Sequence, residues 1–493
     1  MPSLDPSGPD SGPRHPRSVL SLLRRGSVAF TTRLGAPGLL AIAVTALGLG
    51  LRIEHAITFD GPARGADYAV HVEGVRWILE HKRPFDFAET VSGQIRYQPP
   101  LWYALGAVIL RVTGSERAIA ALAVIGWAVR QLLLALLLRR AIPARPWSAL
   151  AALAINAVLP LSVLTDGKVN PEGLHTTLFM VAVYWLWRME RESHEAGGIS
   201  FRSAGLFGAF AGLAVLTKGT SGVLVLSAAI VLGARAVRLL AGPHTPAAWR
   251  RLVRLALVAA CAWTVVAGWW CGPNLVKYGH PFPHSWDRSP PGDGADPIPY
   301  RRPLGWILPL DWKESLALPV IRTPTEPRPN FWAATVVGTW TDYYNRGFCR
   351  LKGGGTDDHV FWGGWAVSGN CIRLFRVLAR IGICLTLLSL GALAFLVWTT
   401  WRSDGHLGSL ALPATISLSV LFVMLFALTY PYDNSAVLNP RYLMPIATPM
   451  AACLGIALGQ IEGARRLRLV LHGIAFVGIA AVAILVVVER ISR

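Results

Sequence analysis

The chain has 493 residues, of which 53% are hydrophobic and only 15% are charged. Soluble domains carry about 25% charged residues, and they lack repeated apolar runs of about 20 residues, the length that crosses a bilayer core. The composition therefore excludes an ordinary soluble protein and predicts an all-α polytopic membrane protein. The formal net charge of +19 does not indicate nucleic-acid binding, because the arginine clusters lie between apolar runs, as basic cytoplasmic loops do.

The N-terminal residues 1–34 are rich in Pro, Ser, Gly and Arg and contain no cleavable apolar core. We therefore expect a disordered cytoplasmic tail and not a signal peptide. The six cysteines show no CxxC spacing and give no indication of a zinc site. Cys349 and Cys371 both fall in the longest polar loop, where a disulfide and two free thiols are equal alternatives.

Apolar runs predict eleven membrane-spanning helices and one partial helix. The predicted spans are 37–57, 118–138, 147–164, 173–188, 203–217, 220–238, 252–271, 378–400, 409–430, 441–459 and 469–488. At 1.5 Å per residue, the run 99–113 covers only about 22 Å of the roughly 30 Å core, so we predict a re-entrant or interfacial helix there. A full span at this place would also put the later arginine clusters outside, against the positive-inside rule.

This topology divides the chain into four parts. The tail 1–34 is followed by a catalytic transmembrane module, 35–275, which contains the first outer loop, 58–98. An extracytoplasmic loop, 276–376, and C-terminal transmembrane helices, 377–493, complete the chain. The outer loops and the short turns near 165–172 and 218–219 then face the same extracytoplasmic side of the plasma membrane, where their polar residues can form one site.

The segment 65–85 predicts a helix in the membrane interface, with Val72, Val75 and Ile78 on the side that faces the membrane. Asp67 and His71 are four residues apart and therefore share a face of this helix. A capping or dipole role in the first helical turn is an equal alternative for Asp67.

Several other polar segments lie where apolar runs begin or end. Tyr97 and Gln98 precede the two prolines that open the partial helix. The turn TDGKVNPEGLH at 165–175 is either functional or ordinary turn chemistry. Lys218 interrupts an apolar stretch, and Arg441 opens a late span. Both suit an anion such as a phosphate, while a snorkelling lysine and an interfacial arginine are the alternatives.

The order of these segments resembles the C-type glycosyltransferase superfamily. Asp67 after the first span, PPL at 99–101, LTKG at 216–219, WWCGPN with YGHP at 269–281, and PRYLMP at 440–445 carry the resemblance. Its nearest groups are family-39-like transferases, protein O-mannosyltransferases and lipid A aminoarabinose transferases, and it extends from about residue 37 to 460. The family implies seven spans before a large outer loop and a catalytic aspartate that maps to Asp67. Many members have Asp-Glu at this place, whereas Tyr68 follows Asp67 here.

The resemblance implies a glycosyltransferase that moves a hexosyl or pentosyl group from a polyprenyl phosphate to a lipid, glycan or protein acceptor, with inversion. Asp67 would be the general base, tuned by His71. We expect cations to bind the donor phosphate, namely Lys218, Arg441, Arg96 and Lys168. We expect sugar or acceptor contacts from Tyr97, Gln98, Asp166, Asn170, Glu172 and Tyr442.

No spacing requires a metal, and a base with cations suffices for the reaction. Asp67, His71, Asp166, Glu172 and His175 are nevertheless suitable ligands, so a divalent metal stays an alternative. Two rival functions are a transporter or flippase of lipid-linked sugars and a non-catalytic assembly partner that kept the fold. Sparse charges within the spans and the lack of an internal repeat count against a transporter. The missing acid after Asp67 keeps the assembly partner open.

Overall fold

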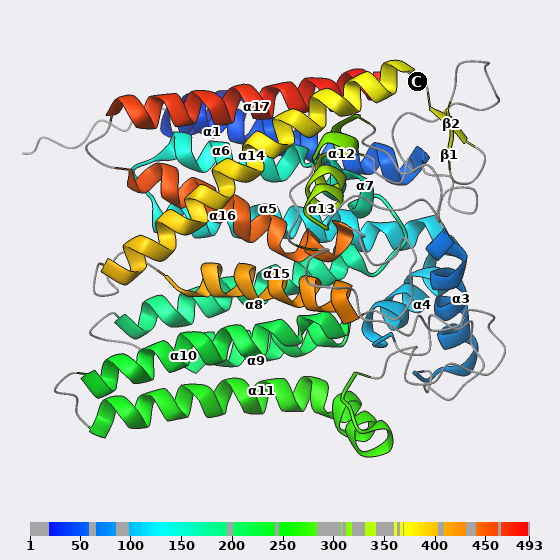
Figure 1. The fold of residues 1–493 in the computed structure, drawn as a ribbon, viewed down its shortest axis with the longest axis vertical. Coiled ribbons are helices and arrows are strands. Elements are labelled where there is room, and N and C mark those ends of the chain that lie inside the picture. Colours follow the sequence, from blue (N-terminus) through cyan, green and yellow to red (C-terminus); the bar gives the residue numbers. More distant parts are fainter. Residues whose placement is uncertain are drawn as a thin grey trace, which may run out of the picture.

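The computed structural model describes residues 19–58, 66–84, 98–194, 201–241, 246–282, 307, 312–317, 331–341, 359–361, 365–367, 369–402, 409–429, 440–461 and 465–491. In these ranges the regular elements are helices apart from one antiparallel hairpin, β1 (His359–Phe361) paired with β2 (Trp365–Val367). Figure 1 shows the helices packed side by side as a bundle. The predicted all-α polytopic membrane fold is confirmed.

The bundle is formed by the long helices. They are α1 (Val19–Thr58), α5 (Ala121–Ala141), α6 (Pro146–Val158), α7 (Pro160–Asp166), α8 (Glu172–His194), α9 (Phe201–Val215), α10 (Val223–Ala241), α11 (Pro246–Tyr278), α14 (Gly369–Arg402), α15 (Ala411–Thr429), α16 (Met444–Gln460) and α17 (Arg465–Ile491). In the described part of the chain, eight helices are long and apolar enough to cross a membrane. A ninth span results if α6 and α7, bent by 53° at a break, cross together.

The remaining two predicted spans coincide with α8 and α9. α9 has 15 residues and belongs to the shorter apolar helices, while α8, with 23 residues, is less apolar than the helices that qualify as spans. Both lie within the bundle, since α9 packs against α8 and α11 (Figure 1). Their crossing of the membrane therefore stays a prediction.

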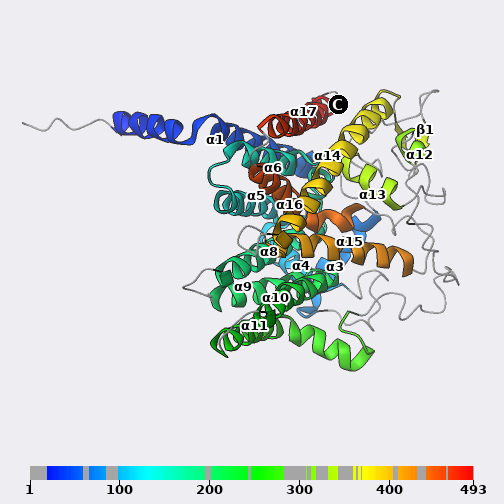
Figure 2. The ribbon, with the colours of Figure 1, turned by 60° about the vertical axis from the view of Figure 1, so that its left-hand side comes forward.

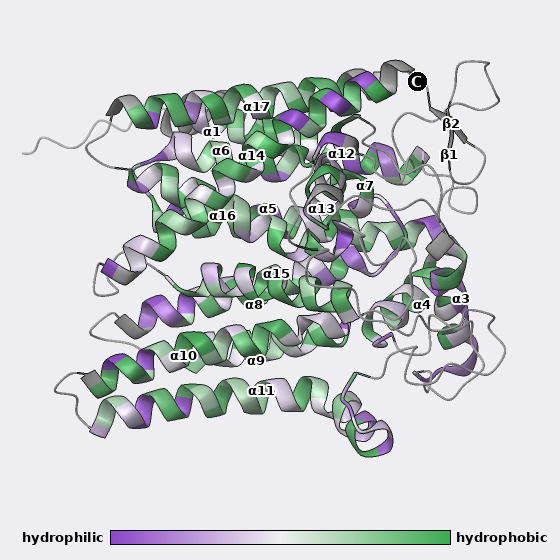
Figure 3. Ribbon diagram, viewed as in Figure 1, coloured by the Kyte–Doolittle hydropathy of each residue, from purple (hydrophilic) through white to green (hydrophobic). Residues whose placement is uncertain are grey.

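Short helices and the hairpin gather toward one end of the bundle, on the right in Figure 1. They are α3 (Ala66–His81), α4 (Leu101–Thr113), α12 (Lys313–Ala317), α13 (Phe331–Trp340) and the β1–β2 hairpin. Hydrophilic residues are concentrated toward the two ends of the bundle, and hydrophobic residues fill the middle of the helices (Figure 3). This is the distribution expected for helices in a bilayer.

The partial helix predicted at 99–113 is α4. Its 13 residues are too few for a span, and it ends at Gly114, whose φ of 66° is left-handed and suits glycine. The prediction that the apolar face of α3 lies on the membrane is wrong. Val72, Val75 and Ile78 are buried against Trp102 of α4 and its neighbours, because α4 offers an apolar surface directly beneath them.

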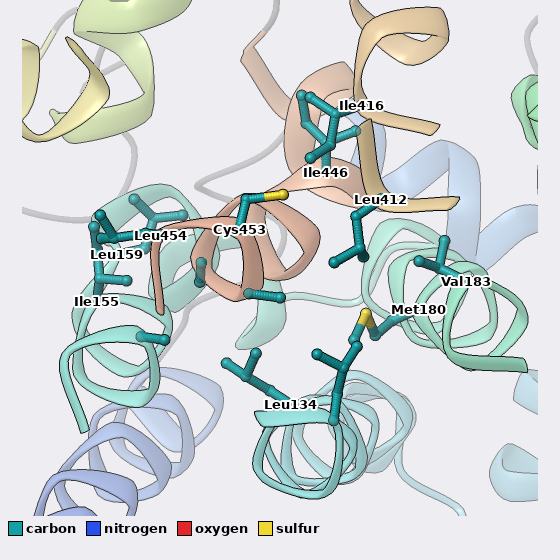
Figure 4. Packing of buried hydrophobic residues seen from close by; sticks show 14 of the residues in the cluster. Leu134, Ile155, Leu159, Met180, Val183, Leu412, Ile416, Ile446, Cys453 and Leu454 are labelled. Carbon is teal, nitrogen blue, oxygen red and sulfur yellow. The ribbon is translucent and has the colours of Figure 1, made fainter. Parts of the chain in front are cut away.

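The hydrophobic core is centred on α16. Figure 4 shows Cys453 and Leu454 of α16 surrounded by side chains of α5, α6, α8 and α15, among them Leu134, Ile155 and Leu412. Glycines permit this packing, since a Cβ on Gly455 would meet the Ala152 Cβ at 2.8 Å. α16 therefore links the N-terminal helices to the C-terminal helices.

Two segments differ from the sequence-based expectation. α1 begins at Val19, inside the segment expected to be disordered. The apolar residues around Leu20 to Leu23 support a helix there. Residues 1–18 lie outside the described part of the chain. The first part of α1 projects beyond the bundle (Figure 2), and Gly35, with φ 61°, separates it from the second part. α11 continues through Pro273 to Tyr278, beyond the end of the predicted span at residue 271.

Most of the predicted outer loop 276–376 lies outside the described residues. The same holds for Cys349 and for the side chain of Cys371, so a disulfide between them stays a question for experiment.

The contact of α9 with α11 gives a direct test of the packing. A Cβ on Gly208 would lie 2.1 Å from the backbone oxygen of Ala259, a contact that requires the two helices to separate. We expect Gly208→Ala to destabilise the protein by about 1–3 kcal/mol, the usual cost of overpacking. The measurement is the thermal melt of the purified protein.

Gly233→Ala in α10 is the matched control, because a Cβ there meets no atom within 4 Å. Equal melting temperatures for the two variants would contradict the close α9–α11 contact.

Candidate active site

One carboxylate and two cations form the centre of the site. Lys218 Nζ lies 2.9 Å from Glu172 Oε1, and Arg441 Nε lies 3.4 Å from the same oxygen. The three side chains are only 5%, 12% and 24% exposed for Glu172, Lys218 and Arg441, respectively. The formal charges of these three side chains sum to +1, because two cations share one carboxylate.

Each of these residues comes from a place where a helix begins or breaks. Glu172 is the first residue of α8, and the Asn170 side chain accepts its backbone N–H at 3.0 Å, which caps the helix. Lys218 is an extended residue between α9 and the short 3₁₀ helix η2 (Gly219–Gly222). Arg441 belongs to η6 (Pro440–Leu443), which precedes α16. The chain changes direction where a helix begins or is interrupted. These places bring side chains from distant segments of the sequence to one point.

Tyr442 packs beside both cations. Lys218 Nζ lies 4.8 Å from the centre of its ring, and Arg441 Cζ lies 5.8 Å from it. Glu172 Oε2 is buried and has no hydrogen-bond partner among the described residues. A buried oxygen of this kind is costly unless a ligand or water donates to it, so it marks a place for a hydroxyl donor.

α3 and α4 border this centre. His71 Nδ1 lies 2.9 Å from the Tyr103 hydroxyl, and its ring lies edge-on to Trp102. Burial raises the pKa of Glu172, but the charges of Lys218 and Arg441, with a further contribution from His71, hold it well below its usual range. The N–H of Leu101, at the start of α4, donates to the Leu216 carbonyl at 2.9 Å. α4 is thus attached to the helix break that carries Lys218.

The other residues predicted in the first outer loop are only partly described. Asp67 is the second residue of α3, one turn before His71, and its side chain lies outside the description. Arg96 and Tyr97 also lie outside the described residues, and the partly buried Gln98 directly precedes Pro99.

Tyr68 stands where many members of the family that the sequence resembles have a second acid. Its side chain binds the carboxylate of Glu116. Its hydroxyl donates to Glu116 Oε2 at 2.8 Å, and Arg76 pairs with the other oxygen of Glu116. Burial, together with this hydrogen bond, raises the pKa of Tyr68 to about 12. The hydroxyl therefore stays protonated at neutral pH and serves as a donor.

Asp166 is buried and paired with two arginines. It is fully buried, its Oδ2 accepts Arg52 Nε at 3.1 Å and the Ser162 hydroxyl at 2.7 Å, and its Oδ1 pairs with Arg130. Arg52 also stacks on Trp127, with 4.1 Å between Cζ and the ring centre. Both carboxylate oxygens are thus occupied, which makes Asp166 a residue that joins α7 to α1 and α5.

Two cavities lie on either side of η6. The smaller, about 410 Å³, is lined by apolar residues and by His175, Thr220, Ser419 and Tyr442. The larger, about 730 Å³, lies between α6, α7, α13, α14 and α16 and is mainly apolar. Both cavities therefore reach the helical turn that contains Arg441.

His175 does not join the carboxylates as a metal ligand would. Its Nε2 lies 2.7 Å from the Ser221 hydroxyl, below Lys218. Lys168 is on the turn between α7 and α8, where its N–H donates to the Thr165 carbonyl. Within the described ranges, no three His, Cys, Asp or Glu side chains gather closely enough to hold a metal ion. The carboxylates of Asp166 and Glu172 are paired with cations instead.

Sequence reasoning named all three members of the central cluster and also Asp166, but it missed the partners of Asp166. Arg52, Arg130 and Ser162 bind Asp166, and none was predicted as a site residue. The signal was present, since Arg52 and Arg130 lie inside predicted spans, where a charge needs a partner.

A protein-family model described as "Family of unknown function (DUF6541)" matches residues 10–292, more than half of the chain. No curated protein matches the sequence. The structure is similar to the apo oligosaccharyltransferase of Archaeoglobus fulgidus, with 13% identity and a TM-score of 0.45. The similar part covers 92% of this chain, and this chain spans only 56% of that protein.

It is also similar to ArnT of Cupriavidus metallidurans bound to undecaprenyl phosphate, with 15% identity and a TM-score of 0.39 over 90% of this chain and 78% of the other. The apo state of the same ArnT gives 13% identity and a TM-score of 0.37, covering 94% of this chain and 78% of the other. At these TM-scores the similarities do not by themselves define a common fold.

The buried ion pairs of Asp166 predict a large effect on stability. Asp166→Asn leaves Arg52 and Arg130, which are 0% and 1% exposed, without their anion. We expect a loss of about 3–5 kcal/mol, as for other broken buried pairs. The thermal melt in detergent is the measurement.

Arg76→Gln breaks the ion pair with Glu116, in which the Arg76 side chain is 62% exposed, and serves as the control. Exposed pairs contribute about 0–1 kcal/mol, so this variant should melt close to the wild type. A small loss for Asp166→Asn would show that the aspartate is not the structural anion.

Proposed function

The chain belongs to the DUF6541 family, and we propose that it is a membrane glycosyltransferase that moves a sugar from a polyprenyl phosphate to an acceptor. The observation that carries the proposal is the Glu172–Lys218–Arg441 cluster at the end of the bundle that holds α3 and α4. It supplies excess positive charge at the boundary of an apolar bundle. A donor with a phosphate and a lipid chain requires this combination.

The cations act on the leaving group. When the bond between the anomeric carbon and the phosphate oxygen breaks, its electron pair stays on the lipid phosphate, which gains negative charge. Lys218 and Arg441 would stabilise this charge in a site where burial strengthens electrostatic interactions. Arg96 and Lys168 remain candidate contributors to phosphate binding.

The acceptor requires a base. Asp67 would take the proton from the acceptor hydroxyl while the hydroxyl oxygen attacks the anomeric carbon, and one displacement inverts that carbon. His71, one turn later on α3 and close to Glu172, would orient the Asp67 carboxylate and adjust its basicity. Asp67 lies at the start of a helix that borders the cation cluster, which supports this role.

Glu172 would bind the substrate as well as the cations. One oxygen holds Lys218 and Arg441, while the second is buried without a partner among the described residues. A sugar hydroxyl donating to Oε2 would satisfy it. Tyr442, Asn170, Tyr97 and Gln98 stay candidates for the sugar or acceptor. The pairing of the buried Asp166 with Arg52 and Arg130 counts against a sugar contact there.

The lipid chain needs an apolar place near the phosphate. The 730 Å³ cavity beside η6 would take the first isoprene units, because it adjoins the turn that carries Arg441. The charge pattern of the sequence supports an extracytoplasmic site, with the arginine-rich helix ends in the cytoplasm. A divalent metal is not needed for these steps.

The two rival functions predict no sugar transfer. A transporter requires a polar path through the bundle, and the buried charges of Arg52, Asp166 and Arg130 are satisfied by one another. An assembly partner requires no base, so the role of Asp67 separates it from an enzyme.

A transfer assay in proteoliposomes tests the proposal. A panel of polyprenyl-phosphate sugars is offered to the wild type, Asp67→Asn and Lys218→Met, and the release of free polyprenyl phosphate is measured. We expect release by the wild type, a loss of about 10²–10⁴-fold for Asp67→Asn, and a loss of about 10²–10³-fold for Lys218→Met.

Lys277→Met is the matched control, since this exposed lysine lies at the end of α11 and outside the cluster. It should keep the wild-type rate. Release that does not depend on Asp67, or no release from any donor by well-folded protein, would refute the proposal.

A further inference from the structure

The first turn of α3 is joined to a part of the chain that does not carry the cation cluster. The hydroxyl of Tyr68 donates a hydrogen bond to Glu116 Oε2 at 2.8 Å. Glu116 is the first residue of the short 3₁₀ helix η1 (Glu116–Ala120), which leads directly into α5. The hydrogen bond therefore attaches the start of α3 to the start of a long helix of the bundle.

The carboxylate of Glu116 binds α3 at a second point. Arg76, about two turns after Tyr68 on the same helix, pairs with the other oxygen of Glu116. The Glu116 side chain is only 24% exposed. Because one carboxylate binds two positions of α3, the contact restricts both the rotation and the sliding of this helix.

The ring of Tyr68 keeps its hydroxyl at this place. The side chain is buried in one apolar cluster with Val72 and Val75 of α3 and Trp102 of α4. A tyrosine that is buried in this way still needs a partner for its hydroxyl, and Glu116 supplies it. Packing and the hydrogen bond therefore act together on the first turn of α3.

An adjacent side of α3 borders the candidate active site. His71 Nδ1 lies 2.9 Å from the Tyr103 hydroxyl, and His71 contributes to the low pKa of Glu172. Asp67 precedes His71 by four residues, so the two positions share a side of the helix. Tyr68 is the next residue, and neighbouring helical positions point about 100° apart. The rotation of the first turn, which Tyr68 fixes, therefore decides where the Asp67 position faces.

We propose that Tyr68 is a positioning residue for the transfer reaction, because its hydrogen bond to Glu116 holds the first turn of α3 in the orientation that Asp67 needs. Tyr68 would act through the backbone of its neighbour and not by contact with the substrate. Since Asp67 is the base of the proposed function, the role of Tyr68 rests on that function.

The accuracy that proton transfer requires gives this hydrogen bond its effect. A general base must lie within about 2.6–3.2 Å of the group whose proton it takes. A displacement of about 1 Å can slow a reaction by about a hundredfold. The cations of the cluster come from the α9–η2 junction and from η6, and not from α3. Loss of the Tyr68 hydroxyl should therefore lower kcat and leave the KM for the donor almost unchanged.

A purely structural role for the same hydrogen bond is the alternative. Its loss would then destabilise the protein and reduce the amount that is folded. This would lower every activity by the same factor, including the residual activity of protein that lacks the Asp67 carboxylate. The experiment therefore compares Tyr68→Phe in the presence and in the absence of that carboxylate.

The test measures kcat and the donor KM of the full-length protein in the proteoliposome assay, with Tm as the control for folding. We expect Tyr68→Phe and Glu116→Ala each to lower kcat by about ten- to a hundredfold. The double variant should be no slower than Glu116→Ala alone, because both changes remove the same bond. Glu116→Gln keeps an oxygen that can accept from Tyr68, so it should retain most of the rate.

Tyr184→Phe is the matched control. Tyr184 is also buried, and its hydroxyl accepts a hydrogen bond from Arg140 at 2.8 Å. It lies about 18 Å along α8 from Glu172, so its loss should leave kcat unchanged. An equal loss of kcat in Tyr184→Phe and Tyr68→Phe would overturn the positioning role.

In the Asp67→Asn background, Tyr68→Phe should cause no further loss, because the base is already absent. A further loss of the same size there, or a wild-type kcat for Tyr68→Phe with Asp67 intact, would overturn the positioning role and leave the proposed function standing. Release that does not depend on Asp67 would refute both, and the comparison of the wild type with Asp67→Asn alone reveals that outcome.

Discussion

The buried ion pairs between Asp166 and two arginines constrain the geometry of the candidate site. Asp166 ends α7, and its carboxylate is held by Arg52 of α1 and Arg130 of α5. An unpaired charge in an apolar bundle costs several kcal/mol, so the three helices must meet at this point. The next residues form the short turn that leads into α8, which means that the ion pairs also fix where Glu172 begins its helix.

The same turn is enclosed on both sides. A Cβ on Gly167 would lie 2.4 Å from a His55 ring carbon, and a Cβ on Gly173 would lie 2.2 Å from the Ala123 Cβ. The turn thus fits between α1 and α5 only with glycine at these positions. The Asn170 cap then directs Glu172 toward the helix breaks that supply Lys218 and Arg441. In the proposed function, a rigid support of this kind would hold the two cations in place for the phosphate of the donor.

The buried carboxylates at the two ends of the bundle have different partners. At the α3–α4 end, Glu172 is shared by two cations and retains an unpartnered oxygen within the described residues, which suits a reacting ligand. At the other end, Glu190 uses its carboxylate to cap α15. Between them, α16 fills the apolar centre and carries η6 at its start.

The sequence by itself determined the membrane class, most of the helices and the shortness of α4, because these follow from local apolar length. It also named Lys218, Glu172 and Arg441 as site candidates, because charges near membranes are rare. It could not assign partners to those charges. Only the tertiary structure decided that Glu172 joins the two cations whereas Asp166, six residues earlier, is buried with Arg52 and Arg130. The two carboxylates therefore have different partners, although they are close in the sequence. Such long-range contacts have no local signature, since they depend on which helices lie side by side.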